Sequence, residues 1–313
     1  MSLIASLNKS KQVYIAGASI DKNAIALSGE NLYKLQRVLL HVFLDLKKAC
    51  DKYDCKVYLC GGTALGAIRH KNYIPWDDDF DVAMSRKDYN RLKLFFDEEL
   101  GDKYILNAPN LSSQPITRFP KVLMKGTVFE LYGEKYNKNT SCVCLDIFVI
   151  DNVPDQLPRR ILKGLFANFC EFSASQAYSR MNWDESKQIY EATGKGYALL
   201  KKLLGLSLSI IPYKMWVEMI DKAVQHDNEE SKYCGLCTGR KHYFGEIMRR
   251  EAFFPGRKAE FAGYCFDVFN EVETYLENLY GADYITPPPE CQREHHFVTR
   301  IEFLNECASD TEN

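Results

Sequence analysis

The sequence predicts an α/β (α+β) protein in which helices flank a mixed β-sheet core and a helical subdomain is inserted beside that core. Two observations carry this prediction. Short apolar runs with the two-residue period of strands alternate with helical patterns in the first half of the chain, and the pattern turns helical between residues 157 and 225. With 313 residues, of which 46% are hydrophobic, the chain is long enough to bury a substantial core.

The predicted elements begin after some thirty residues that show no clear period. From Asn31 to about Asp51, apolar residues recur on one helical face and predict a scaffold helix. Residues 56–60 predict a buried strand. Further along, Ser85 can cap another helix with Asp88 three residues later. Strand-like runs follow at residues 103–107, 118–124 and 127–132.

A glycine pair, Gly61 and Gly62, ends the strand at residues 56–60. Glycine adopts backbone angles that other residues resist, so amide groups here can approach an anion closely. Thr63 would then open a short helix, whose free N–H groups suit a phosphate oxygen. Arg69 and Lys71 follow one or two turns later and add positive charge. The segment therefore predicts a phosphate-binding turn.

Acidic and apolar residues alternate over residues 79–84 with the period of a strand. Asp79 and Asp81 would share one face, and Asp77 joins them if the extended conformation begins early. Crowded carboxylates raise each other's pKa unless a cation neutralises them, and oxygen-rich clusters suit Mg²⁺ or Mn²⁺. A solvated acidic turn is the alternative, but it does not explain the neighbouring glycine pair.

Another acid, Asp146, stands alone among apolar residues in the predicted strand at 141–151. An unpaired carboxylate in a buried strand is costly, so we expect Asp146 to face a metal, a cation or a site. Asp151, at the end of the same run and before Pro154, is predicted to be a turn residue.

Two basic residues, Arg118 and Lys121, lie on another predicted strand. A nucleotide diphosphate needs cationic partners, and these two side chains are candidates. The alternative is a solvent-facing strand edge, which Pro120 favours. Near the other end of the chain, His295 and His296 follow a proline-rich turn. Histidine can bind phosphate or move a proton near neutral pH, although adjacent histidines point apart on a strand.

The helical region contains an amphipathic run at residues 201–211 with lysines at one end. Two interpretations remain open for it. Core packing is favoured, because a mixed helix of this length is ordinary in a globular protein. Peripheral contact with a membrane is the alternative.

Composition narrows the possible functions. A formal net charge of -2 argues against a nucleic-acid binder, and the start of the chain lacks the features of a signal peptide. We therefore expect a cytoplasmic protein whose 11 cysteines are mostly reduced thiols. Two close pairs, Cys142 with Cys144 and Cys234 with Cys237, could bind zinc or act in redox chemistry, but buried thiols are the favoured interpretation.

The run GGTALGAIRHKNYIPWDDDFDVAM at residues 61–84 closely resembles the LicD family, named for bacterial choline-phosphate transfer onto surface glycans and related to fukutin and fukutin-related protein. The resemblance resumes at residues 145–151, and more loosely at 280–289 with the two histidines that follow. It implies a nucleotidyltransferase-like catalytic core at residues 1–154, a helical insertion at 155–230 and a C-terminal part at 231–313 that completes the active-site cleft.

The resemblance implies a reaction as well: transfer of a substituted phosphate from a CDP-linked donor to a hydroxyl of a glycan, with release of CMP. Asp77, Asp79 and Asp81 match the metal-binding acids of the family. Asp146 matches its third acid, which either completes the metal shell or takes the proton from the acceptor. CDP-choline is the expected donor, and Trp76, with Tyr73, offers aromatic faces to a quaternary ammonium.

Other interpretations stay open at this stage. Ethanolamine, aminoethylphosphonate, glycerol and ribitol phosphates are alternative head groups. The acceptor is a glycan of lipopolysaccharide or teichoic acid type, or its lipid-linked precursor at the inner face of the membrane. Transfer of NMP from an NTP is the second candidate function, and glycan binding without catalysis is the third.

Overall fold

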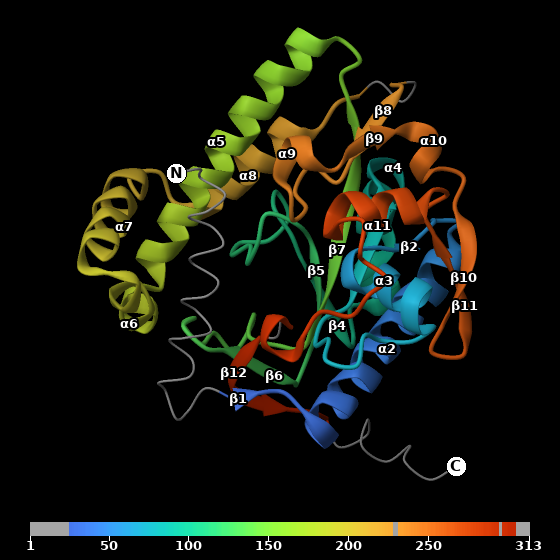
Figure 1. Cartoon of the computed structure of the whole chain (residues 1–313), viewed down its shortest axis with the longest axis horizontal. Helices are drawn as coiled ribbons and strands as arrows, with labels where there is room; N and C mark the ends of the chain where they lie inside the picture. The colour runs from blue at the N-terminus through green and yellow to red at the C-terminus, as the bar shows by residue number, and fades with distance from the viewer. Residues whose placement is uncertain (1–24, 228–230, 294–295, 305–313) are drawn as a thin grey trace.

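The computed structural model describes residues 25–227, 231–293 and 296–304 (Figure 1). Within these residues, the larger sheet has nine strands. Seven of them follow the order β10-β11-β2-β3-β7-β5-β4, and β8 and β9 extend from the far end of β7. Their bounds are β2 Tyr58–Leu59, β3 Asp81–Ser85, β4 Tyr104–Asn107, β5 Lys121–Met124, β7 Cys144–Val153, β8 Tyr233–Gly235, β9 Ile247–Arg249, β10 Arg257–Phe261 and β11 Tyr264–Val268. The predicted mixed sheet with flanking helices is confirmed.

Parallel and antiparallel pairs both occur in this sheet. β3 runs parallel to β7, while β5 pairs with the other edge of β7 in the antiparallel sense. Asp81 is the register partner of Asp146, and Lys121 is the register partner of Asp146 from the opposite side. Because residues opposite one another in a sheet point to the same face, three polar side chains from three adjacent strands lie side by side.

Helices pack on this sheet as their apolar stripes predict. The long predicted helix is α2, Gly29–Lys52, which buries one face and packs against α4, Arg86–Leu100, and against β7. The expected cap of α4 is present, since the Ser85 hydroxyl accepts a hydrogen bond from the Asp88 amide. α3, Gly61–His70, packs against α11, Val272–Tyr280. Short helical segments complete this part: α9 His242–Gly245, α10 Arg250–Phe253 and η1 Glu290–Gln292.

A small second sheet joins distant parts of the chain. It has the order β1-β12-β6, with bounds β1 Ile25–Ala26, β6 Val128–Leu131 and β12 Phe297–Glu302. β12 pairs with both neighbours in the antiparallel sense. β12 therefore lies next to β6, the strand that precedes β7 in the chain.

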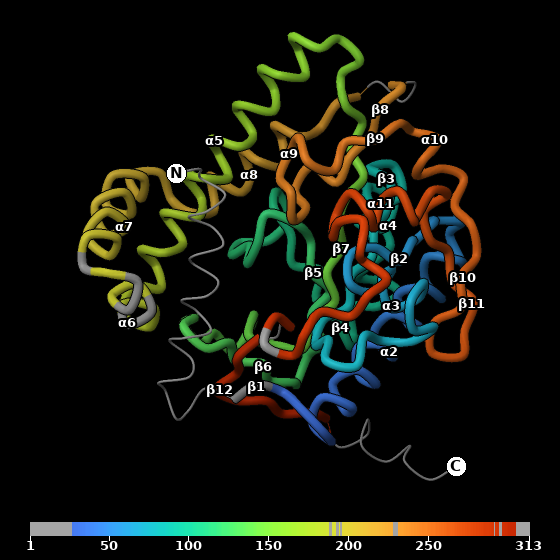
Figure 2. Tube along the Cα trace, in the orientation of Figure 1, coloured from blue at the N-terminus to red at the C-terminus, as the bar shows by residue number. Residues whose placement is uncertain are grey.

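Four helices form a group to one side of the sheet, as Figure 2 shows. They are α5 Leu157–Met181, α6 Trp183–Thr193, α7 Lys195–Leu208 and α8 Tyr213–Val224. α5 and α8 share a second apolar core, which includes Ala167, Cys170, Trp216 and Ile220. The predicted insertion at residues 155–230 contains these four helices.

Length and apolar composition let none of the described helices cross a bilayer by itself. One pair of segments, Gly196–Leu208 and Tyr213–Val224, meets the length and composition criterion jointly, but the two bend by 79° where they meet.

The prediction made for Asp151 is wrong. Asp151 is not a turn residue but lies inside β7, where it is 1% exposed. Its two carboxylate oxygens accept hydrogen bonds from Arg86 at 2.8 Å each, and Arg86 also donates to Asp221 of α8 at 2.9 Å. The strand continues past Asp151 because β8 pairs with this part of β7. This ion-pair network connects α4, the sheet and the helical group.

Candidate active site

The glycine pair forms the first turn of α3 and makes room for the acids. Gly61 has a φ of +51°, and a β-carbon there would overlap Asp81 Oδ2. The Gly62 amide donates to the same oxygen at 3.2 Å, and a β-carbon at Gly62 would lie 2.8 Å from Asp77 Oδ2. The Asp81 amide donates to the Thr63 hydroxyl at 2.8 Å. In this structure, the turn therefore holds carboxylates, and its contact with a donor phosphate stays a prediction.

The acids of residues 77–81 crowd at the start of β3. Burial and the charges of Asp79 and Asp81 raise the pKa of Asp77 well above its ordinary value. Burial and the charges of Asp79 and Asp146 do the same to the pKa of Asp81. Asp79 lies between them in the sequence, and its pKa is raised to about 6, chiefly by burial. Such a group holds excess negative charge and is suited to a divalent cation.

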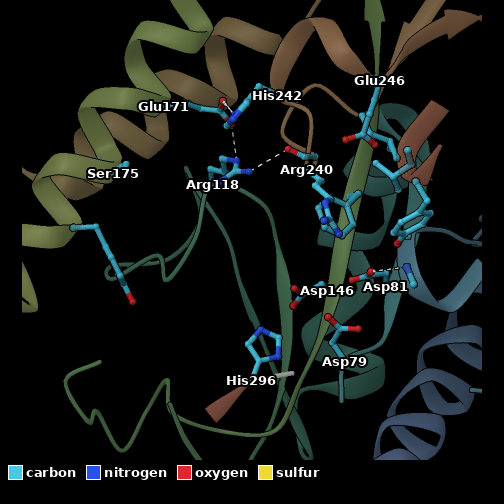
Figure 3. Close-up of a pocket in the computed structure, with 18 of the residues that line it drawn as sticks. Asp79, Asp81, Arg118, Asp146, Glu171, Ser175, Arg240, His242, Glu246 and His296 are labelled. Atoms are coloured by element: carbon cyan, nitrogen blue, oxygen red, sulfur yellow. Dashed lines mark hydrogen bonds and ion pairs between the residues drawn. The ribbon is translucent and has the colours of Figure 1, made fainter. Parts of the chain in front are cut away.

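Asp146 faces this group from β7 and has a cation of its own. Lys121 Nζ lies 2.6 Å from Asp146 Oδ1. Burial lowers the pKa of Lys121, but the charge of Asp146 outweighs this effect and raises it, so the ammonium stays protonated. Figure 3 shows Asp79, Asp81 and Asp146 close together, with Asp79 in the segment before β3, Asp81 on β3 and Asp146 on β7.

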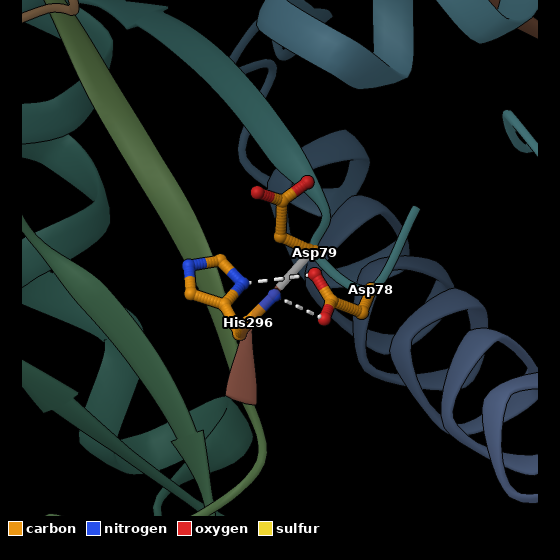
Figure 4. Close-up of side chains that lie close together, drawn as sticks. All are labelled: Asp78, Asp79 and His296. Carbon is orange, nitrogen blue, oxygen red and sulfur yellow. Dashed lines mark hydrogen bonds and ion pairs between the residues drawn. The ribbon is translucent and has the colours of Figure 1, made fainter. Parts of the chain in front are cut away.

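His296 joins the acids from the other end of the chain, as Figure 4 shows. Its backbone amide and its ring Nδ1 both lie 2.8 Å from oxygens of Asp78, which is 6% exposed. Burial lowers the pKa of His296, but the hydrogen bond to Asp78 and the charges of Asp78 and Asp79 raise it to about 9. Ligand atoms of Asp78, Asp79 and His296 lie within 4.8 Å of one another, close enough to hold a metal ion.

A cavity of about 1650 Å³ extends from the acids to the helical group. Its wall on the sheet side includes Asp77, Asp79, Asp81 and Asp146, and its opposite wall comes from α5, α6 and α7. Tyrosines are frequent in both walls: Tyr178, Tyr190, Tyr197, Tyr275, Tyr280 and Tyr284. The cavity has room for a nucleotide donor and a second substrate together.

Similarity to known proteins agrees with this arrangement. Residues 54–155 match the family described as LicD/FKTN/FKRP, nucleotidyltransferase domain. Residues 54–155 are a LicD-family domain. Over 270 residues, the chain is 28% identical to the lipopolysaccharide cholinephosphotransferase LicD of Haemophilus influenzae, with coverage of 85% of this chain and 96% of that protein. Two shorter matches, each 36% identical over 50 residues, are to uncharacterized proteins of Rickettsia prowazekii and Rickettsia typhi. Each match covers 16% of this chain; it covers 19% of the R. prowazekii protein and 16% of the R. typhi protein.

The LicD domain supplies the glycine turn and the four predicted metal-binding acids, but the cavity also uses residues outside it. Arg118 lies inside the domain and points across the cavity. Its guanidinium lies 2.6 Å from Glu171 of α5 and donates to the carbonyl oxygens of Thr238 and Gly239. Arg118 is thus a bridge between the LicD domain, the helical group and the loop after β8, rather than a solvent-facing strand edge.

Among Arg69, Lys71, Tyr73 and Trp76, Trp76 alone lines the cavity. Arg69 donates to the Tyr284 carbonyl at 2.8 Å, and Lys71 is exposed and lies 3.3 Å from Glu260. Trp76 lines the cavity with the Arg293 guanidinium 4.2 Å from its ring centroid. Tyr73 is buried and packs on Phe80 and Phe261, so the interpretation that it offers a face to a head group is wrong. His295 lies outside the described residues.

The cysteine pairs do not form one zinc site within the described chain. Cys144 opens β7, whereas Cys234 pairs with Asn152, eight residues further along that strand, at a distance of about 26 Å. Cys142, Cys234 and Cys237 are buried, as favoured from the sequence. Burial raises the pKa of the Cys234 thiol to about 11, so this thiol stays protonated and unreactive at neutral pH.

Asp78, Arg240 and Glu171 are among the site residues that the sequence-based prediction lacks. Asp78 is out of phase with Asp77 and Asp79, and its partner lies 218 residues away. Arg240 lines the cavity from a loop that has no periodic signal. Glu171 had a usable signal, because it is the only acid in the sequence of α5. A lone acid in an apolar segment was the cue that found Asp146, and it applies equally to Glu171.

Proposed function

We propose that this protein transfers a substituted phosphate, phosphocholine before other head groups, from a CDP-linked donor to a hydroxyl of a cell-surface glycan or of its lipid-linked precursor. The observation that carries the proposal is the register of β3 and β7, which sets Asp81 beside Asp146 at the floor of the cavity in a LicD domain. The Haemophilus relative, matched over 96% of its length, is named a lipopolysaccharide cholinephosphotransferase.

The reaction needs one bond to form and one to break. The acceptor oxygen attacks the phosphorus that carries the head group, the bond from this phosphorus to the CMP oxygen breaks, and CMP leaves with the electron pair. We assign the acceptor proton to the Asp146 carboxylate. Its Oδ1 is held by Lys121, which fixes the orientation of the group and leaves Oδ2 for the acceptor.

The acids fit a divalent cation, Mg²⁺ or Mn²⁺. Burial is the main cause of their raised pKa values and neighbouring carboxylates add to it, so a bound cation would stabilise the charged forms of these acids. Both oxygens of Asp78 already bond to His296, so we assign the ion to Asp79 and Asp81, with Asp77 beside them. A bound cation would neutralise charge on the donor phosphates.

Cationic side chains around the cavity suit the diphosphate of the donor. Arg118, Arg240 and His296 all line it. Trp76, Tyr280 and Tyr284 line it as well and can offer aromatic faces to a quaternary ammonium, an interaction worth about 0.5–2 kcal/mol. This margin favours choline only modestly over other head groups. We further place the reaction in the cytoplasm, where CDP-activated donors are made.

A donor screen tests the proposal. The purified protein is incubated with Mg²⁺, a glycan acceptor and CDP-choline, CDP-ethanolamine, CDP-glycerol or CDP-ribitol, and CMP release and glycan mass are followed. We expect CMP and a glycan heavier by phosphocholine. Preference for CDP-ribitol would overturn the choline assignment while retaining the phosphotransfer. Pyrophosphate release from CTP or ATP, without CMP from any CDP compound, would support NMP transfer instead.

A further inference from the structure

Helix α5 has its large apolar residues on the outside. Its buried face carries small residues, Gly164, Ala167, Cys170, Ala174 and Ala177. Its exposed side carries the large ones, and all are more than 40% exposed: Leu157, Ile161, Leu162, Leu165, Phe166, Phe169 and Phe172. A surface helix of a soluble protein shows the reverse arrangement, with large apolar residues toward the core. The exposed side of α5 is therefore built to contact something apolar.

Helix α7 and the turn after it continue this surface. Leu199, Leu203, Leu206 and Ile210 are between 47% and 85% exposed. The favoured interpretation of residues 201–211 as a core-packed helix is therefore wrong for Leu203, Leu206 and Ile210, whereas Leu208 and Ile211 do pack against the second apolar core. Packing on α5 uses a small residue, since Gly205 is buried and lies close to Gln176 and Arg180 of α5.

The exposed sides of α5 and α7 together form what we call the apolar face. The two helices pack on each other, and Phe169 also contacts Trp216 of α8. Among the described residues, 21 large hydrophobic side chains are exposed, and 14 of these lie between Leu157 and Met215. Soluble proteins scatter exposed apolar residues, whereas a concentration of this kind marks an interaction surface.

The charge of these two helices is positive. α5 contains four basic residues and one acidic residue, and α7 contains three basic residues and no acidic one. The single acid, Glu171, is buried against Arg118 and His242. This local excess contrasts with the whole chain, whose formal net charge is -2. Arg160, Lys163 and Lys201 make contacts within the protein, whereas Arg159, Arg180 and Lys202 are exposed. Exposed basic side chains on helices with an exposed apolar side are typical of helices that lie on anionic membranes.

We propose that the apolar face of α5 and α7 docks on an anionic lipid bilayer, with both helices lying in the interface rather than crossing it. A crossing is disfavoured because α8, the partner of α7 in the bent pair, buries Trp216, Val217 and Ile220 in the protein. Docking is a property of this surface and does not depend on which donor the enzyme uses.

The apolar face also borders the cavity. Phe172 is 43% exposed and Leu200 is 54% exposed, and both line the cavity. A docked protein would thus hold the cavity next to the lipid head groups, so that a glycan anchored in the membrane reaches the acids without leaving the bilayer.

Vesicle binding tests the inference on the full chain. The protein is sedimented with vesicles of equal parts phosphatidylcholine and phosphatidylglycerol, and with pure phosphatidylcholine vesicles. We expect binding to the first and much weaker binding to the second. The double variant Leu162→Glu/Phe166→Glu should bind about tenfold or more weakly, because two exposed apolar side chains no longer enter the interface. Neither residue lines the cavity, so the double variant should turn over a soluble acceptor as fast as the wild type does.

Leu94→Glu is the matched control, since Leu94 is 85% exposed on α4, outside the helical group, and should leave vesicle binding unchanged. Melting temperatures of all variants check that each is folded. Equal vesicle binding by the wild type and the double variant would overturn the proposal, as would absence of binding to the anionic vesicles. Gel filtration adds a further measurement. If the wild type is a dimer, the double variant is a monomer and neither binds vesicles, then a second copy of the chain covers the apolar face instead.

Discussion

Asp79 lies in a balance of opposing charges. Burial and the charges of Asp78 and Asp146 raise its pKa, while His296 and Lys121 lower it. Two cations beside this many carboxylates leave a net negative site, which the divalent ion of the proposed function would neutralise. This charge balance is the residue-scale basis of the proposed chemistry, and it makes the site sensitive to single neutral substitutions.

Asp81→Asn and Asp146→Asn should each reduce turnover by about a hundredfold or more, the scale of a lost electrostatic group in an active site. Both side chains stay close in size, so melting temperatures should change little. CMP release under saturating Mg²⁺ is the measurement, and Asp97→Asn, at an exposed position on α4, is the control. Turnover near the wild-type value in either site variant would contradict the assignment.

Asp79 also predicts a pH dependence of stability when metal is removed with EDTA. Its pKa is about 6 in the folded protein and lower in the unfolded chain, so the folded state holds more protons between about pH 4 and 6. The free energy of unfolding should therefore fall as pH rises through this window. Melting curves from pH 4 to 8 should decline less in Asp79→Asn. Parallel declines would show that Asp79 is not responsible.

Sequence periodicity predicted the acids that share a strand face, because this signal is local. Asp79 and Asp81 were found in this way, and Asp146 as a lone acid in an apolar run; Asp81 and Asp146 are register partners in the sheet. Asp78 was not found, since its role depends on a partner 218 residues away. Asp151 was misread for a related reason: the turn signal of Pro154 is visible in the sequence, whereas the pairing of β7 with β8 is not.

At the scale of elements, β7 organises the molecule. One end of this strand carries Asp146 for the site, and the other carries Asp151 for the ion pair with Arg86. The positions of helices and strands could be predicted from their periods, as α2 and the cap of α4 show. The sheet order could not, because a two-residue period states which face a side chain takes but not which strand lies beside it.

Arg86→Met should lower the free energy of unfolding by about 3–5 kcal/mol, because it leaves the carboxylate of Asp151 buried without its partner. Urea unfolding is the measurement. Lys258→Met breaks an exposed pair with Asp267 and should cost less than about 1 kcal/mol. The double variant Arg86→Met/Asp151→Leu should recover part of the loss. A loss equal to that of Lys258→Met would show that the buried network contributes little.

At the scale of the whole molecule, the cavity lies between two apolar cores. The larger core lies under the sheet, and the smaller one joins α5 to α8. Arg118, Glu171 and His242 connect the two sides. The C-terminal strand closes the other end of the site by carrying His296 to Asp78. Donor, acceptor and membrane would meet here on surfaces from three separate parts of the sequence.

His296→Ala should reduce turnover by about tenfold to a hundredfold, through loss of orientation of the acidic loop. It should lower the melting temperature only slightly, since β12 keeps its backbone pairing with β1 and β6. Steady-state kinetics and melting curves are the measurements. Thr299→Ala, further along β12, is the control. A large drop in melting temperature with retained turnover would assign His296 to folding alone.

The contact between Asp78 and His296 has a consequence for synthesis on the ribosome. The acidic loop is made 218 residues before His296, the residue that holds it. A nascent chain can assemble most of its sheet while that partner is still untranslated. The protein would therefore acquire its finished site only after His296 has been translated, and products terminated before that residue would be inactive even where their sheet has folded.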